Sequence, residues 1–110
     1  MTDNRHGYSV DKVIHEQVRL AILTYIASSE QKEVPFTELK QSLELTAGNL
    51  SVQLRNLEDA GYLTISKTIE GRKPSTTVAM TLAGRDALVS YIAKMEAIIR
   101  TLKTLEENQK

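Results

Sequence analysis

Apolar positions along this chain follow a helical pattern at both ends and shorter, mixed patterns between them. From Asp11, apolar residues recur three and four positions apart as far as Ile26, which predicts a first helix over residues 11–28. The segment Val34-Pro35-Phe36 predicts a short extended piece, because the residue before a proline is pushed out of helical geometry.

Two short helices are predicted to follow in close succession. Thr37 is a candidate N-cap for a helix of about two turns over residues 38–43. Thr46 is a candidate N-cap for a third helix, which Gly61 is well suited to end in a left-handed conformation. Its apolar face carries leucines at i, i+4 and i+7: Leu50, Leu54 and Leu57. Two helices joined this tightly are typical of a helix-turn-helix.

The next segment predicts a β-hairpin with a basic tip. Residues 62–69 alternate apolar and polar side chains, as a strand with one buried face does, and residues 76–80 return as a second strand. Residues 70–75 supply the glycine and proline of a turn, together with two cations, Arg72 and Lys73. A hairpin that directly follows a helix-turn-helix is called a wing.

A last helix is predicted from its N-cap Thr81 to about Leu105, roughly 35 Å long. Its apolar stripe is wider than one small domain can cover, so we expect a second copy of the chain to cover it. The expected dimer surface consists of Leu88, Tyr91, Ile92, Met95, Ile98, Ile99 and Leu102. The alternative is that this helix folds back on the first helix of the same chain.

Composition excludes several kinds of chemistry. The chain has no cysteine, which rules out disulfides, thiolate metal sites and cysteine nucleophiles. We find no phosphate-cradling glycine loop and no set of nucleophile, base and orienting group, so we expect neither an enzyme nor a cofactor. Because no apolar run is long enough to span a bilayer or to act as a secretion signal, the cytoplasm is the expected location.

Several segments together resemble the MarR/ArsR-like winged helix-turn-helix transcriptional regulators, in particular their small single-domain subgroup. The matching segments occur in the same order over about residues 11–92: Val18-Arg19-Leu20-Ala21-Ile22-Leu23, Phe36-Thr37-Glu38-Leu39, Gly48-Asn49-Leu50-Ser51-Val52-Gln53-Leu54, Leu57-Glu58-Asp59-Ala60-Gly61-Tyr62 and Thr81-Leu82-Ala83-Gly84-Arg85. The resemblance implies a cytoplasmic homodimer that binds palindromic operators in double-stranded DNA.

The expected fold class is therefore mostly α with a small β-hairpin, a winged helix-turn-helix with a long C-terminal dimerisation helix. We expect a flexible N-terminal tail over residues 1–10, a DNA-binding domain over residues 11–80 and a dimerisation helix over residues 81–110. Metal-sensing relatives use cysteine or clustered histidine, whereas this chain has only His6 and His15, so no metal site is expected. A small-molecule effector remains open.

The third helix, about residues 46–60, is the expected recognition helix for the major groove. With its leucine side buried, a rotation of 100° per residue turns Val52, Arg55 and Asn56 outward, with further polar residues beside them. We expect base contacts from Asn49, Gln53 and Arg55, a thymine methyl contact from Val52, and phosphate contacts from Thr46, Ser51 and Asn56. The plain alternative is a solvated helix face, with Arg55 paired to Glu58 or Asp59.

The hairpin tip offers a second group of candidates. Arg72 and Lys73 are expected to reach phosphates or an adjacent minor groove, and Lys40 and Lys67 are further phosphate candidates. Fourteen basic residues balance fourteen acidic ones, so we expect modest and strongly salt-dependent affinity. Zero net charge also suits the rival function, a winged-helix protein–protein interaction module without DNA binding. The polar outer face of the third helix favours DNA over that rival.

Overall fold

The computed structural model describes residues 10–108, which form five helices and three strands. In chain order these are α1 (Lys12–His15), α2 (Gln17–Ser28), β1 (Val34–Pro35), α3 (Phe36–Ser42), α4 (Ala47–Asp59), β2 (Leu63–Glu70), β3 (Lys73–Met80) and α5 (Leu82–Asn108). This arrangement confirms the predicted fold class, including the long last helix. The predicted tail, residues 1–10, lies outside the described residues except for Val10, and so does His6.

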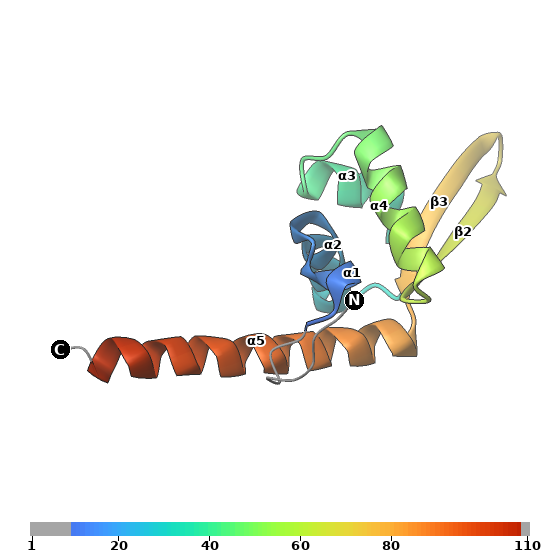
Figure 1. The fold of residues 1–110 in the computed structure, drawn as a ribbon. Coiled ribbons are helices and arrows are strands. Elements are labelled where there is room, and N and C mark those ends of the chain that lie inside the picture. Colours follow the sequence, from blue (N-terminus) through green and yellow to red (C-terminus); the bar gives the residue numbers. More distant parts are fainter. Residues whose placement is uncertain (1–9, 109–110) are drawn as a thin grey trace.

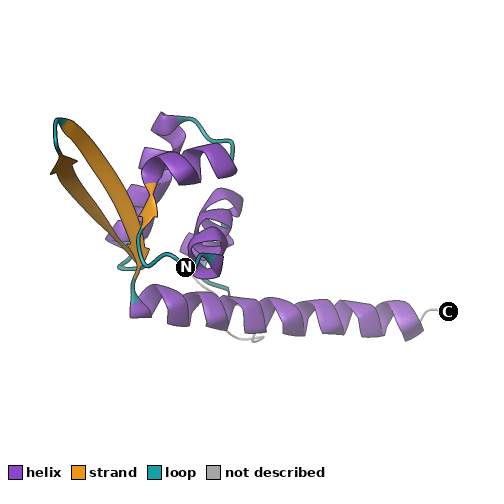
Figure 2. Cartoon of the chain, turned by 180° about the vertical axis from the view of Figure 1, so that it is seen from behind, coloured by secondary structure: helices purple, strands orange, loops and turns teal. Residues whose placement is uncertain are grey.

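Helices α1–α4 and the hairpin form a body that rests on the N-terminal half of α5 (Figure 1). The C-terminal half of α5 extends past this body, which makes the molecule elongated, with extents of 63 × 29 × 25 Å. Seen from behind, the hairpin stands beside α4 at the end of the molecule opposite the carboxyl terminus (Figure 2). No helix among residues 10–108 is both long and apolar enough to cross a membrane.

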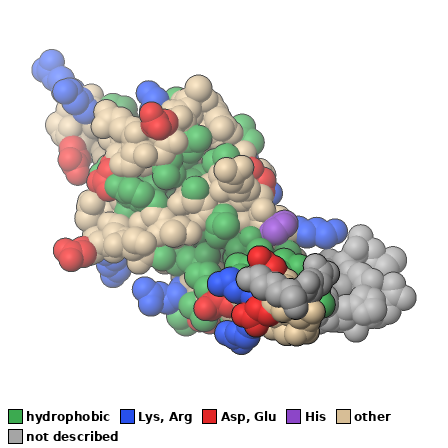
Figure 3. Space-filling model, turned by 90° about the vertical axis from the view of Figure 1, so that its left-hand side faces the viewer, with side chains coloured by type: hydrophobic (Ala, Val, Ile, Leu, Met, Phe, Trp, Pro, Cys, Tyr) green, Lys and Arg blue, Asp and Glu red, His purple; other side chains and the backbone are tan. Residues whose placement is uncertain are grey.

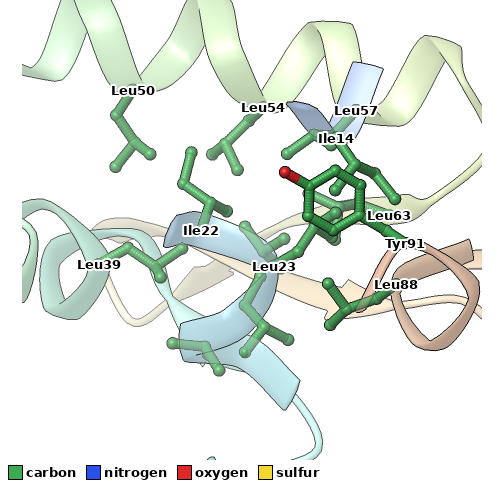
Figure 4. Packing of buried hydrophobic residues seen from close by; sticks show 13 residues of the cluster. Ile14, Ile22, Leu23, Leu39, Leu50, Leu54, Leu57, Leu63, Leu88 and Tyr91 are labelled. Carbon is green, nitrogen blue, oxygen red and sulfur yellow. The ribbon is translucent and has the colours of Figure 1, made fainter. Parts of the chain in front are cut away.

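One hydrophobic core holds the body together. Leu50, Leu54 and Leu57 of α4 point toward Ile22 and Leu23 of α2, and all five side chains are buried (Figure 4). Full burial of a leucine stabilises the folded chain by about 1.5–3 kcal/mol. The predicted leucine face of the third helix is therefore confirmed, and its burial fixes which side of α4 faces outward.

The three strands form an antiparallel sheet in the order β1-β3-β2. The predicted hairpin tip over residues 70–75 was too long, because β2 and β3 stay paired up to Glu70 and Lys73. Gly71 has a positive φ of 63°, which lets the chain reverse in the two residues Gly71-Arg72. Pro74 lies beyond the part of β3 that β1 pairs with, residues 77 and 78, so β3 is an edge strand at this position, where proline is tolerated.

The first predicted helix, residues 11–28, is wrong in one respect: it is interrupted at Glu16, whose ψ of 132° is extended. The Glu16 carboxylate caps α2 by accepting from the backbone N–H of Arg19 at 3.0 Å. The interruption frees the carbonyl of Val13, which accepts instead from Arg19 Nε at 2.6 Å. Side-chain groups therefore replace the backbone hydrogen bonds that an unbroken helix would have made.

Helix ends follow the predicted caps with one exception. Thr46 Oγ1 accepts from the backbone N–H of Asn49 at 3.1 Å, and Thr81 Oγ1 accepts from that of Gly84 at 3.0 Å, as predicted. Gly61 has the left-handed φ of 84° expected after α4. Thr37, however, is not an N-cap: α3 begins at Phe36, directly after Pro35, without a side-chain cap.

The start of α5 packs tightly on the base of the wing. The backbone N–H of Thr81 donates to the carbonyl of Tyr62 at 3.0 Å, and the buried Gly84 lies against the same peptide group. A Cβ at position 84 would overlap the Tyr62 carbonyl oxygen and lie 3.0 Å from its carbonyl carbon. Only glycine therefore allows this approach of α5 to the hairpin.

We predict that Gly84→Ala lowers the free energy of unfolding by about 1–3 kcal/mol, because a fixed backbone group would have to move. Urea unfolding with an unchanged m-value measures the loss. Gly48→Ala is the matched control, because a Cβ at residue 48 meets nothing within 4 Å. That control should leave stability unchanged or raise it by up to about 1 kcal/mol; equal effects of the two substitutions would contradict the packing argument.

Tyr62 also joins the wing base to the first helix. Its hydroxyl donates to Asp11 Oδ2, while Oδ1 of the same carboxylate caps α1. The hydrogen bond to Asp11, with smaller effects from burial and from the Asp11 charge, raises the pKa of Tyr62 from 10.0 to about 12. Ionisation of this tyrosine would break the contact and place two negative charges together.

We predict that the stabilising effect of this contact is complete below pH 10 and is lost as the pH rises to about 12. The sign follows because the unfolded chain ionises Tyr62 at a lower pH than the folded chain does. A phenolate absorbance titration should show one of the four tyrosines ionising near pH 12, and Tyr62→Phe should remove that step. If the substitution instead removes an ionisation near pH 10, the hydrogen bond to Asp11 does not raise the pKa of Tyr62.

Candidate nucleic-acid interface

The outward side of α4 carries nearly all of the side chains predicted for it. Six of these candidates are exposed: Thr46, Asn49, Ser51, Val52, Arg55 and Asn56. Val52 is 59% exposed although it is apolar, so its methyl groups are available to a ligand. The rotation predicted from the three buried leucines therefore matches the structure.

Gln53 is the exception, because it is half-buried and engaged with other side chains. Its Oε1 accepts from Arg19 Nη1 of α2 at 2.9 Å, and its Nε2 donates to Asn49 Oδ1 one turn earlier at 3.3 Å. The structure thus brings Arg19 of α2 into contact with the polar side of α4. Sequence reasoning missed Arg19, since a contact across 34 positions leaves no local pattern.

A groove of about 520 Å³ separates α4 from the hairpin. Its lining is Phe36, Ser51, Leu54, Arg55, Glu58, Ile65, Lys67 and Thr76. Three of the predicted contacts therefore line this groove: Ser51 and Arg55 from α4 and Lys67 from β2. The lining includes two cations, one carboxylate and three apolar side chains, so its charged groups carry a small positive excess.

Arg72 and Lys73 lie at the exposed end of the hairpin, one in the turn and the other at the start of β3. The hairpin rises beside α4, so the two predicted groups of candidates belong to the same end of the molecule (Figure 1). Lys40, by contrast, is exposed on α3 and is not part of the lining of the groove.

Charge is mixed over one face of the molecule. Basic and acidic side chains alternate over the face that lies on the left in Figure 1, as Figure 3 shows. No single-sign field covers this side of the molecule, in agreement with the net charge of zero.

The predicted dimer surface on α5 divides into two parts. Leu88 and Tyr91 are buried in the chain's own core, where the Tyr91 hydroxyl lies 2.9 Å from Nδ1 of His15, so this half of α5 does fold back on α1. Farther along, Ile92, Ile99 and Leu102 stay 45%, 46% and 59% exposed, and Met95 and Ile98 are half-buried. The fold-back alternative thus describes the first half of the helix, while the second half is largely uncovered in the single chain.

Comparison with known proteins identifies relatives along most of the chain. The family model described as Winged helix DNA-binding domain matches residues 18–99. An uncharacterized protein of Methanocaldococcus jannaschii is 33% identical over 95 residues, which cover 86% of this chain and 98% of that protein.

Solved structures show the same arrangement. A transcriptional regulator homologue from Pyrococcus horikoshii OT3 superposes with a TM-score of 0.75 at 30% identity, over 82% of this chain and 87% of that one. A single-residue mutant of MepR from S. aureus, bound to an oligodeoxyribonucleotide, superposes with a TM-score of 0.67 over 90% of this chain and 76% of that one. At 18% identity, this second likeness concerns the fold alone.

Proposed function

The chain belongs to the winged helix DNA-binding domain family, and from that premise we propose that it is a transcriptional regulator that binds double-stranded DNA sequence-specifically as a homodimer. Membership in this family confirms the winged helix-turn-helix regulator that the sequence resembled. The observation that carries the proposal is the exposed polar face of α4 beside a hairpin with a cationic tip. The fold shared with the DNA-bound MepR structure supports it.

In this proposal α4 enters the major groove, where amide and guanidinium groups read base edges best. Asn49 and Arg55 approach bases, and Val52 contacts a thymine methyl. Thr46, Ser51 and Asn56 contact phosphates at the edges of the groove. The hairpin tip lies on the flanking backbone or the adjacent minor groove, where cations are attracted without reading sequence.

The groove between α4 and the hairpin fits a sugar–phosphate strand in the same proposal. Lys67 supplies positive charge from β2, and Ser51 supplies a hydroxyl from α4. Glu58 limits the net attraction there. We therefore propose that binding is modest at physiological salt because few phosphates are neutralised, and that it weakens as salt rises because each of those contacts releases counterions.

We further propose that residues 11–80 form the DNA-binding part and that α5 joins two copies through its protruding half. The residues that would form this contact are Ile92, Met95, Ile98, Ile99 and Leu102, which continue the core-facing side of α5 beyond the body. A dimer matters because two recognition helices can then meet palindromic half-sites about one helical turn, ~34 Å, apart.

We predict that selection from random duplexes at low salt enriches one palindromic sequence. The double substitution Arg72→Ala with Lys73→Ala should leave the enriched sequence unchanged. It should also make the slope of log K against log salt shallower, by the contribution of about two phosphate contacts. Arg100→Ala with Lys103→Ala, an exposed pair of the same charges near the end of α5, is the matched control. Failure to enrich any sequence would favour the protein-interaction alternative.

We predict that Leu102→Gln with Leu105→Gln converts a micromolar dimer to a monomer in sedimentation equilibrium. Both side chains are more than half exposed in the single chain, so their replacement should not unfold the body. Leu82→Gln is the control, because Leu82 is 75% exposed on the opposite side of the same helix. A wild-type chain that sediments as a monomer would refute the homodimer.

A further inference from the structure

A directional chain of hydrogen bonds runs from α2 to the recognition face of α4. Arg19 Nη1 donates to Gln53 Oε1 at 2.9 Å, and Gln53 Nε2 donates to Asn49 Oδ1 at 3.3 Å. We call Arg19, Gln53 and Asn49 the amide relay. All three residues belong to the part of the chain that the proposed function directs at DNA.

The direction of the amide relay follows from chemistry. A guanidinium has only N–H donors, so the Gln53 atom that faces Arg19 must be its oxygen. The other end of the Gln53 amide is then an NH₂ group, which only donates, so the Asn49 atom that it meets must be an oxygen. Because Asn49 Oδ1 is used by the relay, the other polar atom of this amide, Nδ2, takes no part in it.

We infer that Arg19 and Gln53 are positioning residues that make Asn49 present N–H donors to the major groove, which sets its base preference. This inference rests on the proposed function. Two N–H groups match the acceptor edges of guanine, O6 and N7, or of thymine, O4. They do not match the cytosine amino group, which is itself a donor. Gln53 then reads no base directly, contrary to the expectation from its helical position.

Arg19 is poorly placed to act as a phosphate clamp instead. Its side chain is only 18% exposed, and its Nε is taken by the carbonyl of Val13. A Glu16 carboxylate oxygen lies 4.0 Å from Arg19 Nη1 and offsets part of its charge. The guanidinium is thus held from three sides, which is how a fixed donor toward Gln53 is maintained.

The first test is selection of duplexes by the wild-type chain and by single variants. Asn49→Ala, Gln53→Met and Arg19→Met should all relax the same base pair of each half-site, where a preference on the order of tenfold falls to about twofold or less. Methionine keeps the bulk of both longer side chains while removing their hydrogen bonds. Arg19→Lys retains a charged donor and should keep the preference.

A second variant tests the direction of the relay. In Gln53→Glu, the new carboxylate can pair with Arg19 but has no hydrogen to donate, so Asn49 must turn its Nδ2 inward and its oxygen toward DNA. The preferred base at that position should change from guanine or thymine to cytosine or adenine, whose amino groups donate. The added negative charge lowers affinity for every sequence, so only the relative preference is compared.

Lys12→Ala is the control, since it removes one exposed charge from neighbouring α1 and should leave every base preference unchanged. If Gln53→Met and Asn49→Ala relax different base pairs, Gln53 reads its own base and the amide relay is refuted. If Arg19→Met lowers the salt dependence and leaves preferences intact, Arg19 is a phosphate contact and the inference fails. A wild-type chain that enriches no sequence overturns the proposed function itself.

Discussion

The burial of one side of α4 is the constraint on which the candidate interface depends. Three leucines spaced by four and three positions lock this helix onto α2, at 0–1% exposure. A helix turns 100° per residue, so burial of that side leaves no freedom in which residues face away from the body. Val52 and Arg55 are outward because Leu50, Leu54 and Leu57 are inward. The chemistry proposed for the interface is thus a consequence of packing, and a rotation of α4 would exchange its polar face for an apolar one.

Helix α1 has only four residues, yet it connects three elements that the proposed function uses. Asp11 binds the Tyr62 hydroxyl at the base of the wing, and His15 lies against Tyr91 of α5. The carbonyl of Val13 holds Arg19, which in turn holds Gln53 of α4. The Val13 contact exists because the chain is interrupted at Glu16; a continuous helix would have used the same carbonyl for its own backbone. The interruption therefore exchanges backbone hydrogen bonds for side-chain ones, and one of these holds the arginine that reaches Gln53.

Local patterns were enough to predict most of the fold. The leucine face of α4, the caps at Thr46 and Thr81 and the strand β2 each depend on a few neighbouring residues, so the sequence shows them directly, although Ile69 of that strand is exposed and not buried. The features that escaped prediction depend on contacts between distant segments. Arg19 reaches α4 across 34 positions, and Gly84 is required only because the Tyr62 carbonyl lies against it. For the same reason, the helical angle that predicts a base contact for Gln53 does not show its hydrogen bond with Arg19.

The apolar side chains of α5 follow one heptad period, but the body of the protein covers only the first part of the series. Leu88 and Tyr91 begin a heptad series that Met95, Ile98 and Leu102 continue on the same side of the helix. The body covers the first part of this series and ends before the second, so the uncovered part is rigidly continuous with the core (Figure 1). In the proposed dimer, the pairing of two such helices would therefore set the separation of two α4 helices without a hinge between them. That rigidity suits a regulator whose half-sites have one fixed spacing.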